Sequence, residues 1–78
     1  TVKTKAIVIA HAMGNPFDAP GILAVARERG LFVIEDVCDA LGSRIHGRLA
    51  GTFGDLATLS FYASHHVTCG EGGMVLTS

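Results

Sequence analysis

The sequence predicts an α/β fold with a mostly parallel sheet and a crossover helix. Two apolar runs, residues 5–10 and 31–34, lack the alternation of polar and apolar residues, which is typical of parallel strands covered on both faces. Residues 11–30 between them are long enough for the helical connection that joins two parallel strands. We therefore expect a βαβ unit whose first strand lies in the centre of the sheet.

The composition indicates that this sheet belongs to a larger domain. The 78 residues are 49% hydrophobic and 17% charged, whereas soluble domains carry about 25% charged residues. A domain of this size buries only about 60% of the surface that its unfolded chain exposes, so much apolar surface would stay in water. The chain also opens on Thr1 instead of Met and closes just after the apolar run 74–76. We expect residues 1–78 to form a single partial domain.

Charge and cysteine content exclude several classes of protein. The net charge is −1, with 6 basic and 7 acidic residues and no basic cluster, so we expect neither nucleic-acid binding nor attachment to a membrane. No apolar run approaches the ~20 residues that cross a bilayer. Cys38 and Cys69 form neither a disulfide framework nor a paired zinc motif. These features favour a protein of the reducing cytoplasm.

The crossover helix has clear start and stop signals. Asp18 is placed to cap its beginning, and Pro20 fits its first turn, where no backbone N–H is needed. Apolar residues within 22–26 give the helix one buried face, and Gly30 is placed to end it.

The rest of the chain predicts two more strands of the sheet. A polar stretch, residues 44–51, indicates a surface hairpin with its turn near His46. The apolar run 56–62 predicts a third strand, and the run 74–77 predicts a fourth after a glycine-rich connection.

Polar side chains that could carry chemistry follow the second and third strands. They are Glu35, Asp36, Asp39, Ser60, His65 and His66. Ligands of open parallel sheets bind beyond the carboxyl ends of the strands, so we expect these side chains to converge on one crevice. An acid at such a place either caps the next turn or pairs with a buried cation. Ser60 either bonds to the backbone or binds a phosphate.

Other functions of these residues are less well supported. His65, His66 and Cys69 could bind a metal, but structural zinc needs four ligands and no fourth is evident. Cys69 could be a nucleophile, but no third group at a recognisable spacing would orient its base. Cys38, in apolar surroundings, is expected to be a packing residue. The sequence predicts no metal site.

Several blocks in order resemble the DegT-type sugar aminotransferases, which are fold type I pyridoxal phosphate enzymes. The resemblance covers essentially all 78 positions, and its blocks are residues 11–16, 33–36, 39–42, 51–55, 60–62 and 70–73. It implies that the chain is a fragment of the large cofactor-binding domain of such an enzyme. It also implies that Asp36 pairs with the pyridine nitrogen, that Ser60 contacts the cofactor phosphate and that Asp39 lies near the cofactor ring.

One departure from the aminotransferase pattern bears on the reaction. The family's Schiff-base lysine stands five residues after the serine, where this chain has His65, and its only lysines, Lys3 and Lys5, precede the first strand. The change resembles that of the sugar 3-dehydrases, in which the cofactor is held without a covalent bond as pyridoxamine phosphate. The resemblance implies that His65 is the base, and imidazole suits this role because its ordinary pKa lies near neutral pH.

The resemblance further implies a reaction in dideoxysugar synthesis for lipopolysaccharide O-antigen. The favoured substrate is a CDP-linked 4-keto-6-deoxyglucose that loses its 3-hydroxyl. A GDP-4-keto-6-deoxymannose 3-dehydratase or a nucleotide-sugar aminotransferase is the alternative. In the CDP case the full-length homodimer would carry a [2Fe-2S] cluster with ligands outside this chain, reduced by an NADH-dependent iron-sulfur reductase. A non-enzyme alternative is an inactive truncated fragment.

Overall fold

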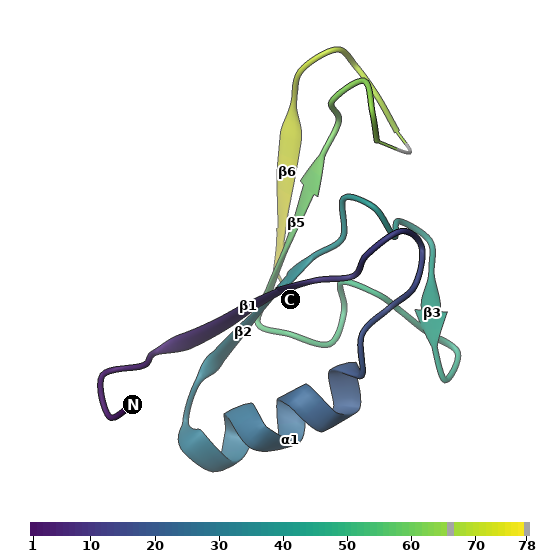
Figure 1. The fold of residues 1–78 in the computed structure, drawn as a ribbon. Coiled ribbons are helices and arrows are strands. Elements are labelled where there is room, and N and C mark those ends of the chain that lie inside the picture. Colours follow the sequence, from purple (N-terminus) through teal and green to yellow (C-terminus); the bar gives the residue numbers. More distant parts are fainter. Residues whose placement is uncertain (66, 78) are drawn as a thin grey trace.

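The computed structural model describes residues 1–65 and 67–77, so that His66 and Ser78 lie outside the described residues. Within these residues one helix packs on a four-stranded sheet, and a separate two-stranded hairpin lies beside them (Figure 1). The elements are β1 (Ala6–Ala10), α1 (Ala19–Arg29), β2 (Phe32–Asp36), β3 (Arg44–Ile45), β4 (Arg48–Leu49), β5 (Leu56–Ser60) and β6 (Gly73–Thr77).

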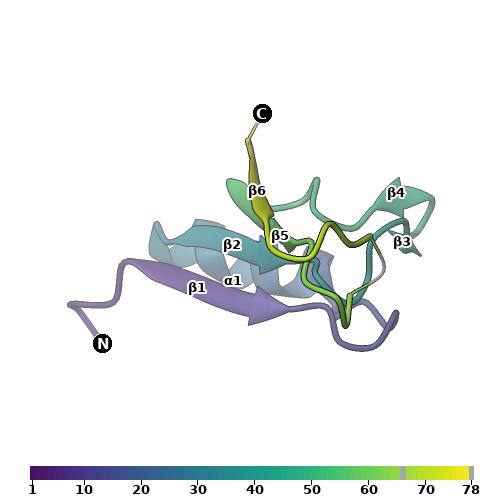
Figure 2. The ribbon, with the colours of Figure 1, turned by 90° about the horizontal axis from the view of Figure 1, so that it is seen from above.

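The sheet is mostly parallel, as the sequence predicts. Its strand order is β1-β2-β5-β6; β1, β2 and β5 run parallel, and only β6 runs antiparallel to its neighbour β5. α1 forms the crossover between β1 and β2 and covers one face of the sheet (Figure 2). The third strand ends at Ser60, two residues earlier than predicted.

The boundaries of α1 follow the predicted signals. The Asp18 carboxylate accepts the Gly21 N–H at 3.2 Å, and Pro20 lies in the first turn. Gly30 adopts a left-handed conformation with φ 65°, and its N–H bonds to the carbonyl oxygens of Ala26 and Arg27.

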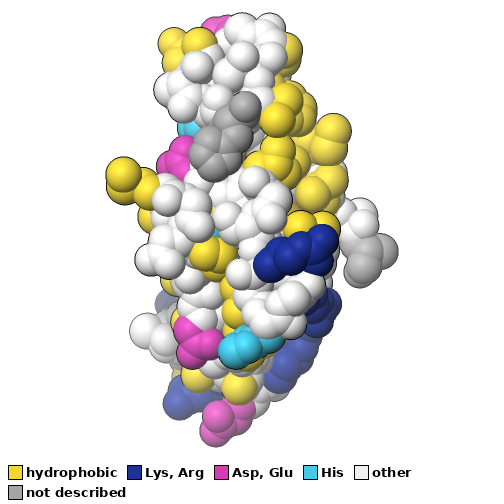
Figure 3. Space-filling view, turned by 90° about the vertical axis from the view of Figure 1, so that its right-hand side faces the viewer, with side chains coloured by type: hydrophobic (Ala, Val, Ile, Leu, Met, Phe, Trp, Pro, Cys, Tyr) yellow, Lys and Arg dark blue, Asp and Glu magenta, His cyan; other side chains and the backbone are white. Residues whose placement is uncertain are grey.

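The prediction of a central first strand is wrong for the described part of the chain. β1 lies at the edge of the sheet, and Val8 in its middle is 67% exposed. The apolar run predicts cover on both faces, but α1 covers only one of them. Phe32 on β2 and Val75 on β6 are similarly open, at 64% and 66%. Figure 3 shows apolar side chains open to solvent in its upper half, where β5 and β6 lie, and most of the basic ones in its lower half.

The small core lies between the sheet and the segments that cross its helix-covered face. It includes Val33, Val37, Ala40 and Ala57, each at most 1% exposed. No helix among the described residues is long and apolar enough to cross a membrane.

Candidate active site

Two predicted site residues end neighbouring parallel strands. Asp36 is the last residue of β2 and Ser60 the last of β5. Asp36 lies opposite Thr58, and side chains two residues apart share a face, so Ser60 projects from the same face as Asp36. The rise along a strand and the spacing between strands put their Cα atoms roughly 8 Å apart.

The Asp36 carboxylate is only partly committed to its own turn. Its Oδ1 accepts the Cys38 N–H at 3.1 Å, which is the capping role that the sequence left open. Its Oδ2 has no hydrogen-bond donor within residues 1–65 and 67–77. One carboxylate oxygen therefore remains able to pair with a cationic N–H.

Ser60 also keeps bonding capacity. Its Oγ accepts the Tyr62 N–H at 3.3 Å, so the expected bond to the backbone is present. Because the hydroxyl acts there as an acceptor, its own proton is left to donate to an anion such as a phosphate.

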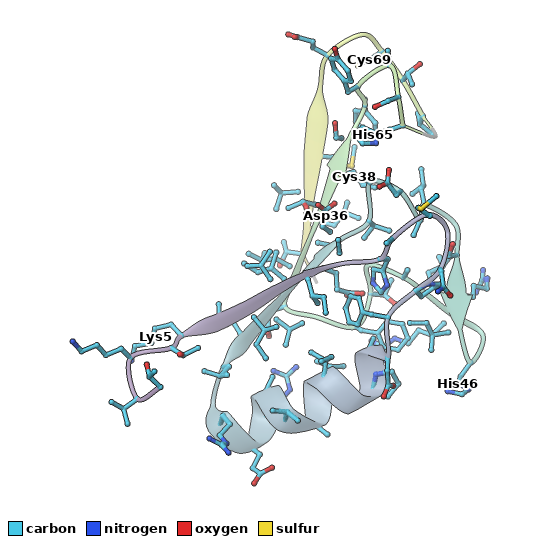
Figure 4. The ribbon with its side chains drawn as sticks, viewed as in Figure 1. Lys5, Asp36, Cys38, His46, His65 and Cys69 are labelled. Atoms are coloured by element: carbon cyan, nitrogen blue, oxygen red, sulfur yellow. The ribbon has the colours of Figure 1, made fainter. Side chains whose placement is uncertain are left out.

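His65 and Asp39 come together from distant parts of the sequence. His65 Nδ1 lies 3.1 Å from Asp39 Oδ1. The exposed fractions of the two side chains are 22% for His65 and 54% for Asp39. Figure 4 shows Asp36, Cys38 and His65 near one another, with Lys5 and His46 far away. His66, the neighbour in the predicted pair, lies outside the described residues.

The thiol of Cys38 lies among these site residues. Burial, followed by the Asp36 carboxylate, raises the pKa of Cys38 to about 11, while the Ser60 backbone opposes the shift. The predicted packing residue is therefore half-buried next to a carboxylate. Cys69 Sγ donates to the Glu71 carbonyl at 3.0 Å. Across the described ranges, no three His, Cys, Asp or Glu side chains gather to hold a metal ion.

The prediction that Glu35 joins this crevice is wrong. Glu35 lies opposite Ala57 on the helix-covered face, because successive strand residues point to opposite faces and Asp36 takes the other one. Its side chain is 0% exposed. Its Oε1 accepts the Gly51 N–H at 2.9 Å, and its Oε2 accepts the N–H groups of Phe53 at 2.8 Å and Gly54 at 2.6 Å.

A fourth donor to Glu35 is His11, which the sequence did not reveal as functional or structural. His11 Nε2 lies 2.8 Å from Glu35 Oε1, and the Phe17 N–H donates to His11 Nδ1 at 3.2 Å. Since Nδ1 accepts, Nε2 must carry the proton that bonds to Glu35. Burial alone would raise the pKa of Glu35, but these hydrogen bonds together lower it.

The arrangement fits a pyridoxal-type cofactor on three counts. A free carboxylate oxygen and a free hydroxyl proton project from one sheet face, roughly one ring-and-phosphate length apart, and the imidazole of His65 is bonded to Asp39, three residues after Asp36. Asp36 would hold the pyridine nitrogen and Ser60 the phosphate. Both groups are held by the backbone of parallel strands, so that they are positioned before any ligand arrives.

Known proteins resemble this chain over its full extent. The model of the DegT/DnrJ/EryC1/StrS aminotransferase family matches residues 1–78. dTDP-4-dehydro-2,6-dideoxy-D-glucose 3-dehydratase of Saccharopolyspora spinosa is 60% identical over 77 residues, which are 99% of this chain and 17% of that protein. The lipopolysaccharide biosynthesis protein RfbH of Salmonella typhimurium is 52% identical over 77 residues, which are 99% of this chain and 18% of that protein.

Solved structures give the same result. GDP-4-keto-6-deoxy-D-mannose-3-dehydratase of E. coli, with bound hydrated PLP, has a TM-score of 0.86 and 36% identity, covering 99% of this chain and 20% of that one. The chain thus spans about a fifth of the length of these relatives. The predicted α/β fold and the family resemblance are both confirmed: the chain belongs to the DegT/DnrJ/EryC1/StrS aminotransferase family.

Proposed function

We propose that this chain is the cofactor-binding segment of a pyridoxamine phosphate-dependent 3-dehydratase that acts on a nucleotide-linked 4-keto-6-deoxyhexose. The observation that carries the proposal is a histidine, His65, bonded to Asp39 at the position where the family pattern has its lysine. Lys5 lies at the far end of the sheet (Figure 4), and Lys3 precedes it. Neither lysine of this chain is placed to bond to a cofactor at Asp36.

Three side chains divide the work in this proposal. The Asp36 carboxylate keeps the pyridine nitrogen protonated, because a nearby negative charge favours the charged form. The Ser60 hydroxyl donates to the phosphate. His65 accepts a proton at a ring nitrogen from the carbon that bears the cofactor's amine. Pyridoxamine phosphate, when bound, supplies that amine for the sugar's keto group and a ring that accepts electrons.

The nucleotide and the electron supply are the finer parts of the proposal. The motifs favour a CDP-linked sugar, whereas the 60% identity with a dTDP-sugar dehydratase favours a dTDP-linked one; both substrates belong to the same chemical class. The CDP-sugar version would be a cytoplasmic homodimer with a [2Fe-2S] cluster outside this segment and a reductase partner. Turnover of CDP-, dTDP- and GDP-linked substrates by the full-length protein, with iron and sulfide analysis, separates these versions.

Reduction with borohydride tests the role of His65. In the full-length protein loaded with pyridoxal phosphate, we expect no cofactor to become attached to this segment, since imidazole forms no reducible imine. His65→Asn should still bind cofactor through Asp36 and Ser60, but should lose the substrate-dependent exchange of the cofactor's methylene proton, because an amide does not accept a proton near neutral pH.

The neighbouring histidine is the matched control. His66→Asn should leave the exchange close to that of the wild type, because the five-residue offset from Ser60 selects His65. Loss of exchange in His66→Asn with retention in His65→Asn would move the base by one residue. Attachment of the cofactor to a lysine of this segment would support the aminotransferase alternative and reject the dehydratase.

A further inference from the structure

We infer that Asp39 is a positioning residue that fixes the ring of His65 in one tautomer, leaving Nε2 as the atom that takes the proton. The inference rests on the proposed function of His65 as the base. It gives Asp39 a different role from that expected of it, because its carboxylate acts through the histidine and not directly on the cofactor.

The hydrogen bond itself defines the tautomer. An ionised carboxylate only accepts, so the bond of 3.1 Å between Asp39 Oδ1 and His65 Nδ1 requires a proton on Nδ1. In a neutral imidazole the other nitrogen then carries the lone pair. Nε2 is on the opposite side of the ring from Asp39, so the basic atom faces away from the carboxylate.

Asp39 is held firmly although its side chain is half exposed. The Gly14 N–H donates to the Asp39 carbonyl at 2.6 Å, and Ser43 Oγ donates to the Gly14 carbonyl at 3.2 Å. The next residue, Ala40, is 0% exposed in the core, and its N–H donates to the Val37 carbonyl at 3.1 Å. The backbone under Asp39 is therefore fixed by the core on one side and by the loop of Gly14 on the other.

The loop that holds Asp39 is itself anchored to the opposite face of the sheet. His11, at the start of that loop, is bound to Glu35 at 2.8 Å and stacks on Phe17, with ring centroids 4.0 Å apart. At the other partner, the His65 N–H donates to the Tyr62 carbonyl at 3.0 Å and closes a turn after β5. Both members of the Asp39–His65 pair are thus positioned by backbone contacts before substrate binds.

The Asp39–His65 pair contributes little to the stability of the fold. A solvent-exposed ion pair contributes about 0–1 kcal/mol, and Asp39 is 54% exposed. Orientation of a base, in contrast, needs only that the favoured tautomer and ring rotation persist. A carboxylate that orients a catalytic imidazole through its Nδ1–H is an arrangement that recurs on unrelated folds.

The test compares Asp39→Ala with Glu28→Ala, which removes an exposed carboxylate from α1. In the full-length protein at alkaline pH, ¹⁵N NMR of the ring nitrogens, assigned by loss of the signals in His65→Asn, reports the tautomer without any need for turnover. We expect Nδ1–H in the wild type and in Glu28→Ala, and a mixture of tautomers in Asp39→Ala. Methylene-proton exchange should fall by about 10- to 100-fold in Asp39→Ala, a part of what a positioned base contributes, with KM for the sugar unchanged.

The outcomes separate this inference from the proposed function. An unchanged His65 tautomer in Asp39→Ala, or an Nε2–H tautomer in the wild type, would overturn the positioning role. A loss of exchange that appears only as a raised KM would overturn it as well, because it would assign Asp39 to substrate binding. If His65→Asn keeps full exchange while the tautomer responds to Asp39→Ala, the contact stands and His65 is not the base.

Discussion

Replacing Glu35 by glutamine tests how strongly the buried acid holds the helix-covered face together. The carboxylate accepts hydrogen bonds from His11 and Gly51 on Oε1, and from Phe53 and Gly54 on Oε2. In glutamine one of these oxygens becomes an NH₂ group, which donates only. Whichever way the amide is turned, two donors lose their acceptor and face another donor.

The expected loss of stability follows from these two unsatisfied donors. A buried donor left unsatisfied costs roughly 1–3 kcal/mol, so two of them cost about 2–6 kcal/mol. His11 has no simple escape, because moving its proton to Nδ1 would set that proton against the Phe17 N–H. A loss of this size is a large part of the 5–15 kcal/mol that stabilises a typical domain. We expect Glu35→Gln to lower the melting temperature strongly and to reduce the yield of folded protein.

The assay is thermal melting of the full-length protein followed by circular dichroism, with Glu28→Gln as control. The control makes the same chemical change at an exposed helix position, where substitutions usually shift stability by less than about 0.5 kcal/mol. Equal melting temperatures for Glu35→Gln and the wild type would refute the reasoning, since they would mean that the N–H groups of Gly51, Phe53 and Gly54 find other partners.

The difference in stability between the wild type and Glu35→Gln should depend on pH, and the direction of the change can be predicted. The pKa of Glu35 is lowered in the folded protein, so ionised Glu35 contributes stability above its unfolded pKa of about 4.3. That contribution is lost as the pH falls through the lower, folded pKa. The difference in stability between the wild type and Glu35→Gln should be constant above about pH 5 and should narrow below about pH 4. A difference that grows on acidification would contradict the ionised state.

Three further predictions concern the site and the chain. Asp36→Asn in the full-length protein should lower turnover by orders of magnitude with an unchanged circular dichroism spectrum, since the ring nitrogen loses its charged partner; near-native turnover would remove Asp36 from the site. The pKa of Cys38 is raised to about 11, so its alkylation by iodoacetamide should accelerate about tenfold per pH unit from pH 8 to 10. Peptide mass spectrometry measures the rate, and a plateau below pH 9 would contradict the raised pKa. The 78-residue chain alone should show no sharp calorimetric transition, because side chains such as Val8 and Phe32 are more than half exposed; a single two-state peak would overturn this.

Local signals in the sequence predicted the elements well. The cap at Asp18, the stop at Gly30 and the presence of two parallel strands each depend on residues close together in the chain, and the structure confirms these three features. The position of β1 in the sheet was missed, because strand order depends on which segments pair, and apolar content does not encode that. An unalternating run indicates that both faces of a strand need cover, whereas the 67% exposure of Val8 shows that one face of β1 is left open in this chain.

The sequence predicted where Asp36 and Ser60 lie in the sheet, but not the contacts among the candidate residues. Placing Asp36 and Ser60 at strand ends needed only the rule for parallel sheets. The bond between Asp39 and His65 joins residues 26 positions apart, and no local pattern specifies such a pair. The error over Glu35 had a signal that could have prevented it. β2 continues to Asp36, and in a strand the side chains of two adjacent acids point to opposite faces.

The two faces of β2 should differ in how well they tolerate substitutions, because Glu35 and Asp36 point to opposite faces. Asp36 on one face keeps a free oxygen for a ligand, while Glu35 on the other is fully used by four donors. The Glu35 face is also closed to new side chains, since a Cβ on Gly54 would lie 2.6 Å from the Val33 carbonyl oxygen. The side chains of Asp39 and His65 are partly open to solvent. Substitutions there should therefore change the reaction without unfolding the protein. A substitution of similar size at Glu35, His11 or Gly54 should instead disturb the packing that supports the sheet face of Asp36.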